Sequence, residues 1–368
     1  MSYYTGRMGA AEGFGLIFVI TLPKIFLSTP GQLIEEGAGL AWLIPLIGGI
    51  AAIVPLLMLN YVSKSTPGDI IAISKKLLGK KTSWLIALFY IGIFFSNAAV
   101  LIRQFAENTL LAALPMTEFS VVIVIYGLVA GILVYLGIES LARSSYLLFP
   151  FMLVGMVLIF VLMYPLYNIY NLAPWQGNGI GAAIKAGIFT GGLNVGALVI
   201  GIFALSFQNY RTRNSCVILG LGSGLIIKSV FIFTYIMAFG VAIAQERTLP
   251  FLEAARVIYL SRYLQRIESL FILLWVIVGV LSIAISVYIA IYLIVRLLNL
   301  PTMTPLIPIT ILILIQLAML PGDITTVIKM DFMLVQTYHS AGIYTVPPLL
   351  FIAALIKKRK KAKLTAVS

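Results

Sequence analysis

Two lysines lie inside strongly apolar stretches of this sequence, Lys24 near the N-terminus and Lys228 in the second half of the chain. An ionisable side chain within a membrane span is costly and usually serves a function. Either ammonium group could occupy the place where another carrier binds a sodium ion, or could titrate as a proton site. The alternative is a lysine that snorkels to the membrane surface, which suits Lys185, at the end of an apolar stretch, better than Lys228.

The apolar stretch around Lys24 also contains a predicted helix break. Pro23 lacks the N–H that a helix needs and clashes with the carbonyl group four residues earlier. A second break is predicted at residues 187–196, where four glycines in ten residues make a continuous helix costly. The candidate ligand-binding residues at the two breaks are Thr21, Leu22, Pro23, Ile25, Thr190, Gly191, Gly192 and Asn194.

A break in the middle of a membrane span leaves backbone groups without partners, which is tolerated only against protein or a water-filled cavity. The N-terminus of a half-helix can then face an anionic group such as a carboxylate, while unwound carbonyl groups can face a cation. Because Gly and Pro are common in membrane helices, each break by itself also has an ordinary structural explanation.

Polar side chains in other apolar stretches are further candidates for the wall of this site. Asn97 suits a cavity wall, and Ser282 and Ser286 share a helix face and could supply hydroxyl ligands. A serine that bonds back to its own helix is the alternative. Arg103 and Glu107 are four residues apart, so we expect them to pair and to serve structure or gating.

The sequence lacks the groups that most catalytic and metal sites need. It contains one Cys, Cys216, and one His, His339, so neither a disulfide framework nor a cysteine-rich zinc site can form. Paired carboxylates, a phosphate-binding loop, an HExxH motif and a nucleophile elbow are all missing from the sequence. We therefore expect no enzymatic activity, no cofactor and no metal site.

The composition predicts an integral membrane protein. Of 368 residues, 61% are hydrophobic and 10% are charged, whereas a globular domain has about 25% charged residues. A span needs about 20 mainly apolar residues. Ten predicted spans cover residues 11–33, 39–62, 84–110, 119–137, 145–165, 183–205, 216–243, 269–296, 304–320 and 340–356.

The positive charge indicates the orientation in the membrane. Sixteen of the 25 Lys and Arg residues fall in alternate segments between the spans, from the N-terminus to a basic tail at 357–368, and five fall in the opposite segments. By the positive-inside rule both termini are cytoplasmic. The orientation in the membrane thus accounts for the net charge of +13, and binding to nucleic acid is not needed to explain it. We expect the tail to bind anionic lipid headgroups, with docking of a partner as the alternative.

The segment between spans seven and eight, residues 245–268, has a helical pattern of its own. Leu252, Ala255, Ile258 and Tyr259 recur at helical spacing, which predicts one or two short amphipathic helices on the outer face. This segment could rest on the bilayer or form a lid over an external vestibule.

The two predicted breaks fall in spans one and six of ten. These positions are equivalent if residues 1–356 form one transmembrane domain of two inverted five-span repeats, at about 11–165 and 183–356. Inverted repeats with discontinuous first helices are how many secondary transporters build a substrate site at the membrane midplane. The predicted fold is therefore an all-α polytopic membrane protein of the amino acid permease type, with discontinuous helices 1 and 6.

Several short motifs resemble those of the permease-like B subunits of spore germination nutrient receptors, the GerAB type. These motifs run almost from end to end of the chain: Leu22-Pro23, Gly39-Leu40-Ala41-Trp42-Leu43, Leu78-Gly79-Lys80, Arg103-Gln104-Phe105, Leu114-Pro115-Met116-Thr117, residues 137–143, and residues 263–271 with Trp275. The resemblance implies a relative of the amino acid/polyamine/organocation transporters. It would lie in the spore inner membrane beside an A subunit and a lipoprotein C subunit, recognise a small nutrient, often an amino acid, and trigger germination. Lys24 and Lys228 match no motif of that family.

Functions of different classes remain open at this point. A receptor subunit would bind a nutrient in a transporter-like pocket, and the ligand would have to prefer one conformation to act on a partner complex. A carrier would move an amino acid by alternating access with proton or sodium coupling, and would have to release it inside. A third interpretation is a scaffold with a vestigial pocket. Flux across the membrane distinguishes the first two.

Overall fold

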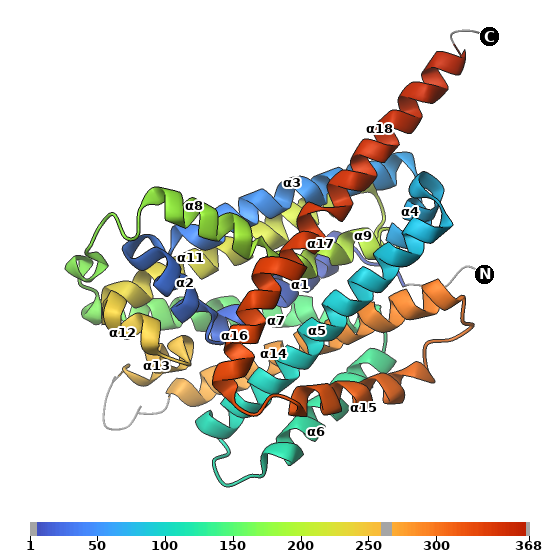
Figure 1. Ribbon diagram of the computed structural model, residues 1–368. Helices are drawn as coiled ribbons and strands as arrows, with labels where there is room; N and C mark the ends of the chain where they lie inside the picture. Colours follow the sequence, from blue (N-terminus) through green and yellow to red (C-terminus); the bar gives the residue numbers. More distant parts are fainter. Residues whose placement is uncertain (1–5, 259–266, 366–368) are drawn as a thin grey trace.

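The computed structural model describes residues 6–258 and 267–365, and these ranges form an almost entirely helical bundle (Figure 1). The predicted all-α fold is therefore confirmed. The longer helices are α1 (Ala10–Thr21), α2 (Thr29–Gly37), α3 (Leu43–Ser65), α4 (Ile70–Leu78), α5 (Lys80–Ala112), α6 (Phe119–Tyr135), α7 (Ile138–Leu162), α8 (Ile180–Phe189), α11 (Gly222–Phe239), α14 (Ile267–Leu298), α15 (Leu306–Met319), α16 (Ile324–Leu334) and α18 (Val346–Thr365). The shorter helices are α9 (Val199–Ile202), α10 (Tyr210–Ser215), α12 (Val241–Glu246), α13 (Pro250–Arg256) and α17 (Ser340–Tyr344).

Tighter or wider helical turns join several of these helices. The 3₁₀ segments are η1 (Pro23–Phe26), η2 (Ala38–Leu40), η3 (Tyr164–Leu166), η4 (Ile169–Leu172) and η5 (Thr190–Leu198), and the π segments are η6 (Cys216–Leu221) and η7 (Val335–His339). A 3₁₀ run as long as the nine residues of η5 is uncommon. It replaces α-helix where the glycines cluster, which confirms the second predicted break.

The first predicted break is also confirmed. The helical stretches Ala10–Phe26 and Thr29–Leu40 are bent by 72°, with η1 between α1 and α2. Seven further helical stretches of the described chain are long and apolar enough to cross a membrane: Leu43–Ser65, Lys80–Ala112, Ile138–Leu162, Ile180–Ile202, Tyr210–Phe239, Phe271–Leu298 and Ile324–Arg359. Two shorter apolar helices, α6 and α15, lie where spans four and nine are predicted. Because these two helices are shorter than a typical span, the full count of ten spans stays a prediction.

The tenth span begins earlier than predicted. Its predicted range is 340–356, but the structure starts the helical stretch at Ile324. Lys329 and Asp331 make its first half too polar to be recognised as a span from hydropathy. Asp331 is buried and paired inside the protein, so the helix can carry it. The fifth span also begins earlier than predicted. Its predicted range is 145–165, but α7 begins at Ile138, so most of the motif at 137–143 belongs to this helix.

Side-chain caps fix the starts of three helices. Asp69, Asn209 and Asp323 precede α4, α10 and α16, and each side-chain oxygen accepts a hydrogen bond of 2.8 Å from a backbone N–H of the first turn. Such a cap satisfies a donor that the helix itself cannot pair. The sequence therefore sets these helix starts locally.

The eighth span, α14, is the centre of the bundle. It packs against α5, α6, α7 and α1, and every residue from 281 to 293 is buried. A helix buried on all sides needs neighbours on every face. By contrast α6 and α7 expose large apolar side chains, such as Leu128, Ile132, Phe151 and Val154, as expected of helices that face lipid.

The predicted helices of residues 245–268 are present in the described part of that segment as the end of α12 and as α13, whereas Tyr259 lies outside the described residues. Phe251 of α13 is fully buried, with its ring centroid 5.1 Å from that of Phe26 and 4.7 Å from that of Phe271. Ser28 donates to the carbonyl of Thr248 at 2.8 Å. This segment covers the first break, which favours the interpretation as a lid.

The basic segments gather at one end of the bundle, where both termini lie (Figure 1). Lys357 of α18 donates to the carbonyl of Lys76 of α4 at 2.9 Å. Asp69, which caps the start of α4, pairs with Arg296 of α14 at 2.6 Å. The α12–α13 segment lies at the opposite end of the molecule in the same view.

Cysteine labelling tests the orientation. Single cysteines replace Lys80, Lys358 or Arg256, which are all exposed, while the native Cys216 is only 1% exposed and should not react. We expect a membrane-impermeant maleimide to label the Arg256→Cys variant from outside, and the Lys80→Cys and Lys358→Cys variants only from the cytoplasmic face of inverted vesicles. Labelling of all three from one side would contradict the predicted topology.

Candidate functional site

A narrow cavity lies between the two helix breaks. Lys24 and Ile25 line it from the first break, Leu193 lines it from the second, and Lys228 lines it from α11. The remaining wall is mainly apolar and consists of Thr29, Pro30, Leu33, Pro45 and Ile232. The cavity measures about 10 Å³, which is room for about one water molecule. A ligand could therefore bind only after the walls move apart.

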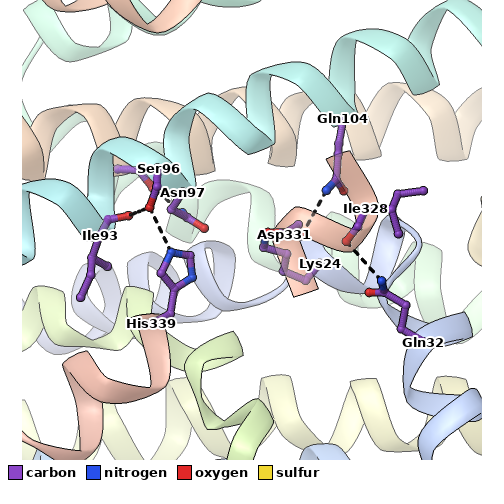
Figure 2. A network of polar contacts seen from close by, with 10 residues as sticks. Lys24, Gln32, Ile93, Ser96, Asn97, Gln104, Ile328, Asp331 and His339 are labelled. Atoms are coloured by element: carbon purple, nitrogen blue, oxygen red, sulfur yellow. Dashed lines mark hydrogen bonds and ion pairs between the residues drawn. The ribbon is translucent and has the colours of Figure 1, made fainter. Parts of the chain in front are cut away.

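The ammonium group of Lys24 forms a buried ion pair with Asp331 of α16 (Figure 2). Gln104 of α5 donates from Nε2 to the other carboxylate oxygen at 3.1 Å. Lys24 is 5% exposed and Asp331 is 4% exposed, so each charge depends on the other for its stability. Gln32 donates to the carbonyl of Ile328 at 3.2 Å (Figure 2), which joins α2, the second half of the first span, to the same helix.

Sequence reasoning missed Asp331, because the predicted tenth span starts at residue 340. A signal was nevertheless present. Val327, Asp331 and Val335 recur at a spacing of four residues and are all buried, the pattern of one helix face. A lysine buried at a break also requires a counter-charge.

Lys228 lines the same cavity in different surroundings. Its side chain is 4% exposed, and its ammonium group donates to Oδ1 of Asn194 at 3.4 Å. Asn194 in turn donates from Nδ2 to the carbonyl of Gly191 at 3.3 Å, which orients the amide. Thr190, Asn194 and Lys228 also lie together at an adjoining small hollow, which has no room for a water molecule. The second break and α11 therefore form one continuous wall.

The second break packs closely against span ten. The hydroxyl group of Ser340 accepts a hydrogen bond from the N–H of Gly192 at 2.7 Å and donates to the carbonyl of Phe189 at 2.7 Å. A Cβ at Gly192 would lie 2.2 Å from the carbonyl oxygen of Val335, so glycine is required for this approach. Gly192 thus contacts span ten, and its role in ligand binding stays a prediction.

Gly191 and Thr190 have similar structural surroundings. A Cβ at Gly191 would lie 1.9 Å from the hydroxyl oxygen of Tyr344, and Thr190 donates to the carbonyl of Ala186 at 2.7 Å. Tyr344 and Ser340 belong to α17, so local sequence patterns at the break could not reveal them. His339 lies beside them, with Nε2 3.3 Å from the hydroxyl oxygen of Ser96 (Figure 2).

Thr21, Leu22 and Pro23 form the turn of the first break. The hydroxyl group of Thr21 donates to the carbonyl of Ile17 at 2.8 Å. The N–H of Ile25 donates to the carbonyl of Leu22 at 2.9 Å, which closes a 3₁₀ turn. Short local hydrogen bonds thus satisfy part of the interrupted backbone.

Of the polar candidates in spans three and eight, one bonds to the last turn of α1, and the other two bond to each other. Ser282 donates to the carbonyl of Val19 at 3.2 Å. Ser286 donates to the carbonyl of Ser282 at 2.9 Å and accepts from Asn97 at 3.0 Å. Ser286 therefore bonds back to its own helix, while Ser282 bonds to the neighbouring span. These three residues line neither of the two hollows beside Lys228.

Two other features do not belong to the cavity. Arg103 and Glu107 form the predicted pair at 2.9 Å, and the guanidinium group lies 4.2 Å from the ring centroid of Phe119. A larger hollow of about 490 Å³ between α6, α7 and α14 is almost wholly apolar and lacks the polar groups that would orient a nutrient. Among the described residues, no three His, Cys, Asp or Glu side chains are grouped to hold a metal ion.

Comparison with known proteins places the chain among spore germination proteins. Residues 7–327 match the family Spore_permease, described as "Spore germination protein". Spore germination protein KB of Bacillus subtilis (strain 168) is 27% identical over 278 residues, 73% of this chain and 72% of that protein. Spore germination protein YndE of the same organism is 24% identical over 281 residues, 74% of this chain and 76% of that protein.

Solved structures with the same fold are transporters. Mhp1, a nucleobase-cation-symport-1 family transporter in a closed conformation with bromovinylhydantoin bound, has a TM-score of 0.69 at 14% identity and covers 95% of this chain and 78% of its own. MhsT in complex with L-phenylalanine has a TM-score of 0.65 at 12% identity, with coverage of 94% and 97%. These likenesses confirm the predicted transporter fold.

Breaking the Lys24–Asp331 pair should destabilise the protein more than removing both charges. Lys24→Met or Asp331→Asn leaves one buried charge without its partner, for which we expect a loss of about 3–5 kcal/mol. The double variant should recover most of this loss. The measurement is a double-mutant cycle by unfolding in detergent.

The Arg143–Glu139 pair of α7 is the control for this cycle. Its side chains are 69% and 32% exposed, and exposed pairs couple by about 1 kcal/mol or less. A Lys24–Asp331 coupling no larger than that of the control would contradict the dependence of the two buried charges on each other.

Proposed function

This chain belongs to the spore germination protein family, and from that premise we propose that it is the nutrient-recognition subunit of a spore germinant receptor. It binds a small ligand, most simply an amino acid, in the cavity between its two helix breaks, and this binding triggers germination. The observation that carries the proposal is the cavity itself, where both breaks and two buried lysines meet. The ligand is bound and released without chemical conversion.

The proposed mechanism requires two conformations with different affinities for the ligand. The described conformation is closed, because its cavity holds about one water molecule and α13 covers the first break from outside. The ligand would reach the site in a more open conformation and then favour closure. It can shift the population only by the ratio of its affinities for the two states.

We propose that the closed state acts on partner subunits, the A subunit and the lipoprotein C subunit that the family resemblance implies, in the spore inner membrane with both termini cytoplasmic. The match of residues 7–327 to the spore germination family supports this assignment. At the end where the termini lie, Lys76, Lys357 and Lys358 line a hollow of about 370 Å³. This supports contact of that end with anionic lipid headgroups.

The alternative is an ion- or proton-coupled amino acid carrier. Its support is the shared fold with MhsT, whose structure contains L-phenylalanine. A shared fold at 12% identity does not determine flux. The carrier must release its ligand on the inner side, whereas the receptor need only hold it.

A binding and flux assay on one preparation distinguishes the two functions. We expect a panel of amino acids and small sugars to include at least one ligand that raises the unfolding temperature of the purified protein. At a ligand concentration of 100 times Kd, the free energy of unfolding should rise by about 2.7 kcal/mol. We expect no uptake of that ligand into liposomes. Uptake driven by a proton or sodium gradient would favour the carrier, and absence of any binding would contradict both.

Replacing Gly192 tests the coupling of the second break to ligand binding. We expect Gly192→Leu to insert into the membrane but lose ligand-dependent stabilisation, because its side chain would push span ten away from the break. Gly181→Leu is the matched control on α8, since a Cβ at Gly181 meets nothing within 4 Å. Equal ligand responses in the two variants would show that this contact does not matter for binding.

A further inference from the structure

We infer that Lys228 anchors an anionic group of the ligand, and that the ligand is therefore a compact carboxylate. This inference rests on the proposed function, because it names the chemistry of the molecule that the cavity would bind. It is carried by a difference between the two ammonium groups that line the cavity: one is neutralised by the protein and the other is not.

The charge of Lys24 is compensated within the protein. Asp331 pairs with Lys24 through one carboxylate oxygen and accepts from Gln104 at 3.1 Å through the other. Both oxygens of this carboxylate are thus engaged. In the described chain no ion pair or hydrogen bond joins Asp331 to Lys228, so this carboxylate compensates Lys24 and not Lys228.

The charge of Lys228 has no such compensation in the described chain. None of the ion pairs there includes Lys228, and its one hydrogen bond, of 3.4 Å, goes to the neutral amide oxygen of Asn194. An ammonium group has three donors, and a buried charge without a partner is strongly unfavourable. A carboxylate bound in the cavity would supply both the counter-charge and the missing acceptors.

The elements packed around Lys228 cannot supply the counter-charge themselves. The walls of the two hollows that it lines contain one other charged residue, Lys24, which has the same sign. The neutral polar residues there are Thr29, Thr190 and Asn194. The hydroxyl group of Thr190 already donates to the carbonyl of Ala186. Among the described residues none supplies a counter-charge to Lys228, so a bound anion would be its partner.

The rest of the cavity indicates what kind of carboxylate would fit. Ile25, Leu33, Pro45, Leu193 and Ile232 form apolar walls around the lysine. Such walls favour a short apolar substituent over a charged or strongly polar one. The narrow cavity further favours a compact molecule, because each added group requires a larger displacement of the two breaks. A small apolar amino acid supplies such a carboxylate and substituent, and its α-ammonium group would have to face the unwound carbonyl groups of the breaks. Its amide removes the negative charge and replaces one acceptor oxygen with an NH2 donor.

Matched pairs of ligands test the role of the charge in the full-length protein. The probes are L-alanine, L-valine and L-leucine, each compared with its carboxamide, together with glucose as a neutral ligand. Binding is measured by isothermal titration and by thermal stabilisation in detergent. We expect the wild-type protein to prefer the acid by about 10- to 100-fold, the ratio that a charge-assisted hydrogen bond contributes.

Variants of Lys228 then assign this preference to one residue. Lys228→Met should bind acid and amide alike, Lys228→Arg should keep part of the preference for the acid, and Lys185→Met, which removes an exposed lysine outside the cavity, should behave as the wild type. If Lys228→Met does not fold, the comparison of acid and amide in the wild type and in Lys228→Arg decides the question.

The possible outcomes separate this inference from the proposed function. Equal binding of acids and amides by the wild type, binding of glucose alone, or an unchanged preference in Lys228→Met would overturn the inference and leave nutrient recognition intact. Failure of every probe to bind would overturn both. A preference for the acid that disappears only with Lys228 would establish the anchor.

Discussion

The interior of a bilayer offers no water, so every backbone group and charge that a helix break exposes must find a partner inside the protein. This requirement connects the parts of the molecule around the two breaks. Ser282 of the eighth span bonds to the first break, and Ser340 of the tenth span bonds to the second. Asp331, also in the tenth span, neutralises the lysine of the first break. Span eight thus stabilises the first interruption, and span ten stabilises both.

Because span ten contacts both breaks, its position depends on both. The π segment η7 (Val335–His339) lies between its contact with Lys24 and its contact with Gly192, and π segments within helices are frequent at functional sites. Span ten thus joins the two breaks through direct contacts. If a ligand binds between the breaks as proposed, a displacement of either break would act on this helix.

The transporter fold supplies the cavity but does not determine the chemistry of its ligand. The structural relatives share 12–14% identity with this chain, so their substrates do not transfer to it. The cavity of this chain is lined by two lysines, one held in an ion pair and one bonded only to an amide. Under the proposed function the protein need not release its ligand inside, so such a site is compatible with a fold that carriers use for alternating access.

The sequence by itself determined the membrane class, the positions of both helix breaks and most of the spans, because composition, Pro23 and the glycines of 187–196 act locally on the backbone. The tertiary structure alone decided which lysine is neutralised. Asp331 lies 307 residues from Lys24, in a stretch that hydropathy excludes from the tenth span, and Ser340 lies 148 residues from Gly192. Periodicity can place Asp331 on a helix face, but no pattern in one segment identifies its partner in a distant span, so only the packing of the bundle reveals which residues pair.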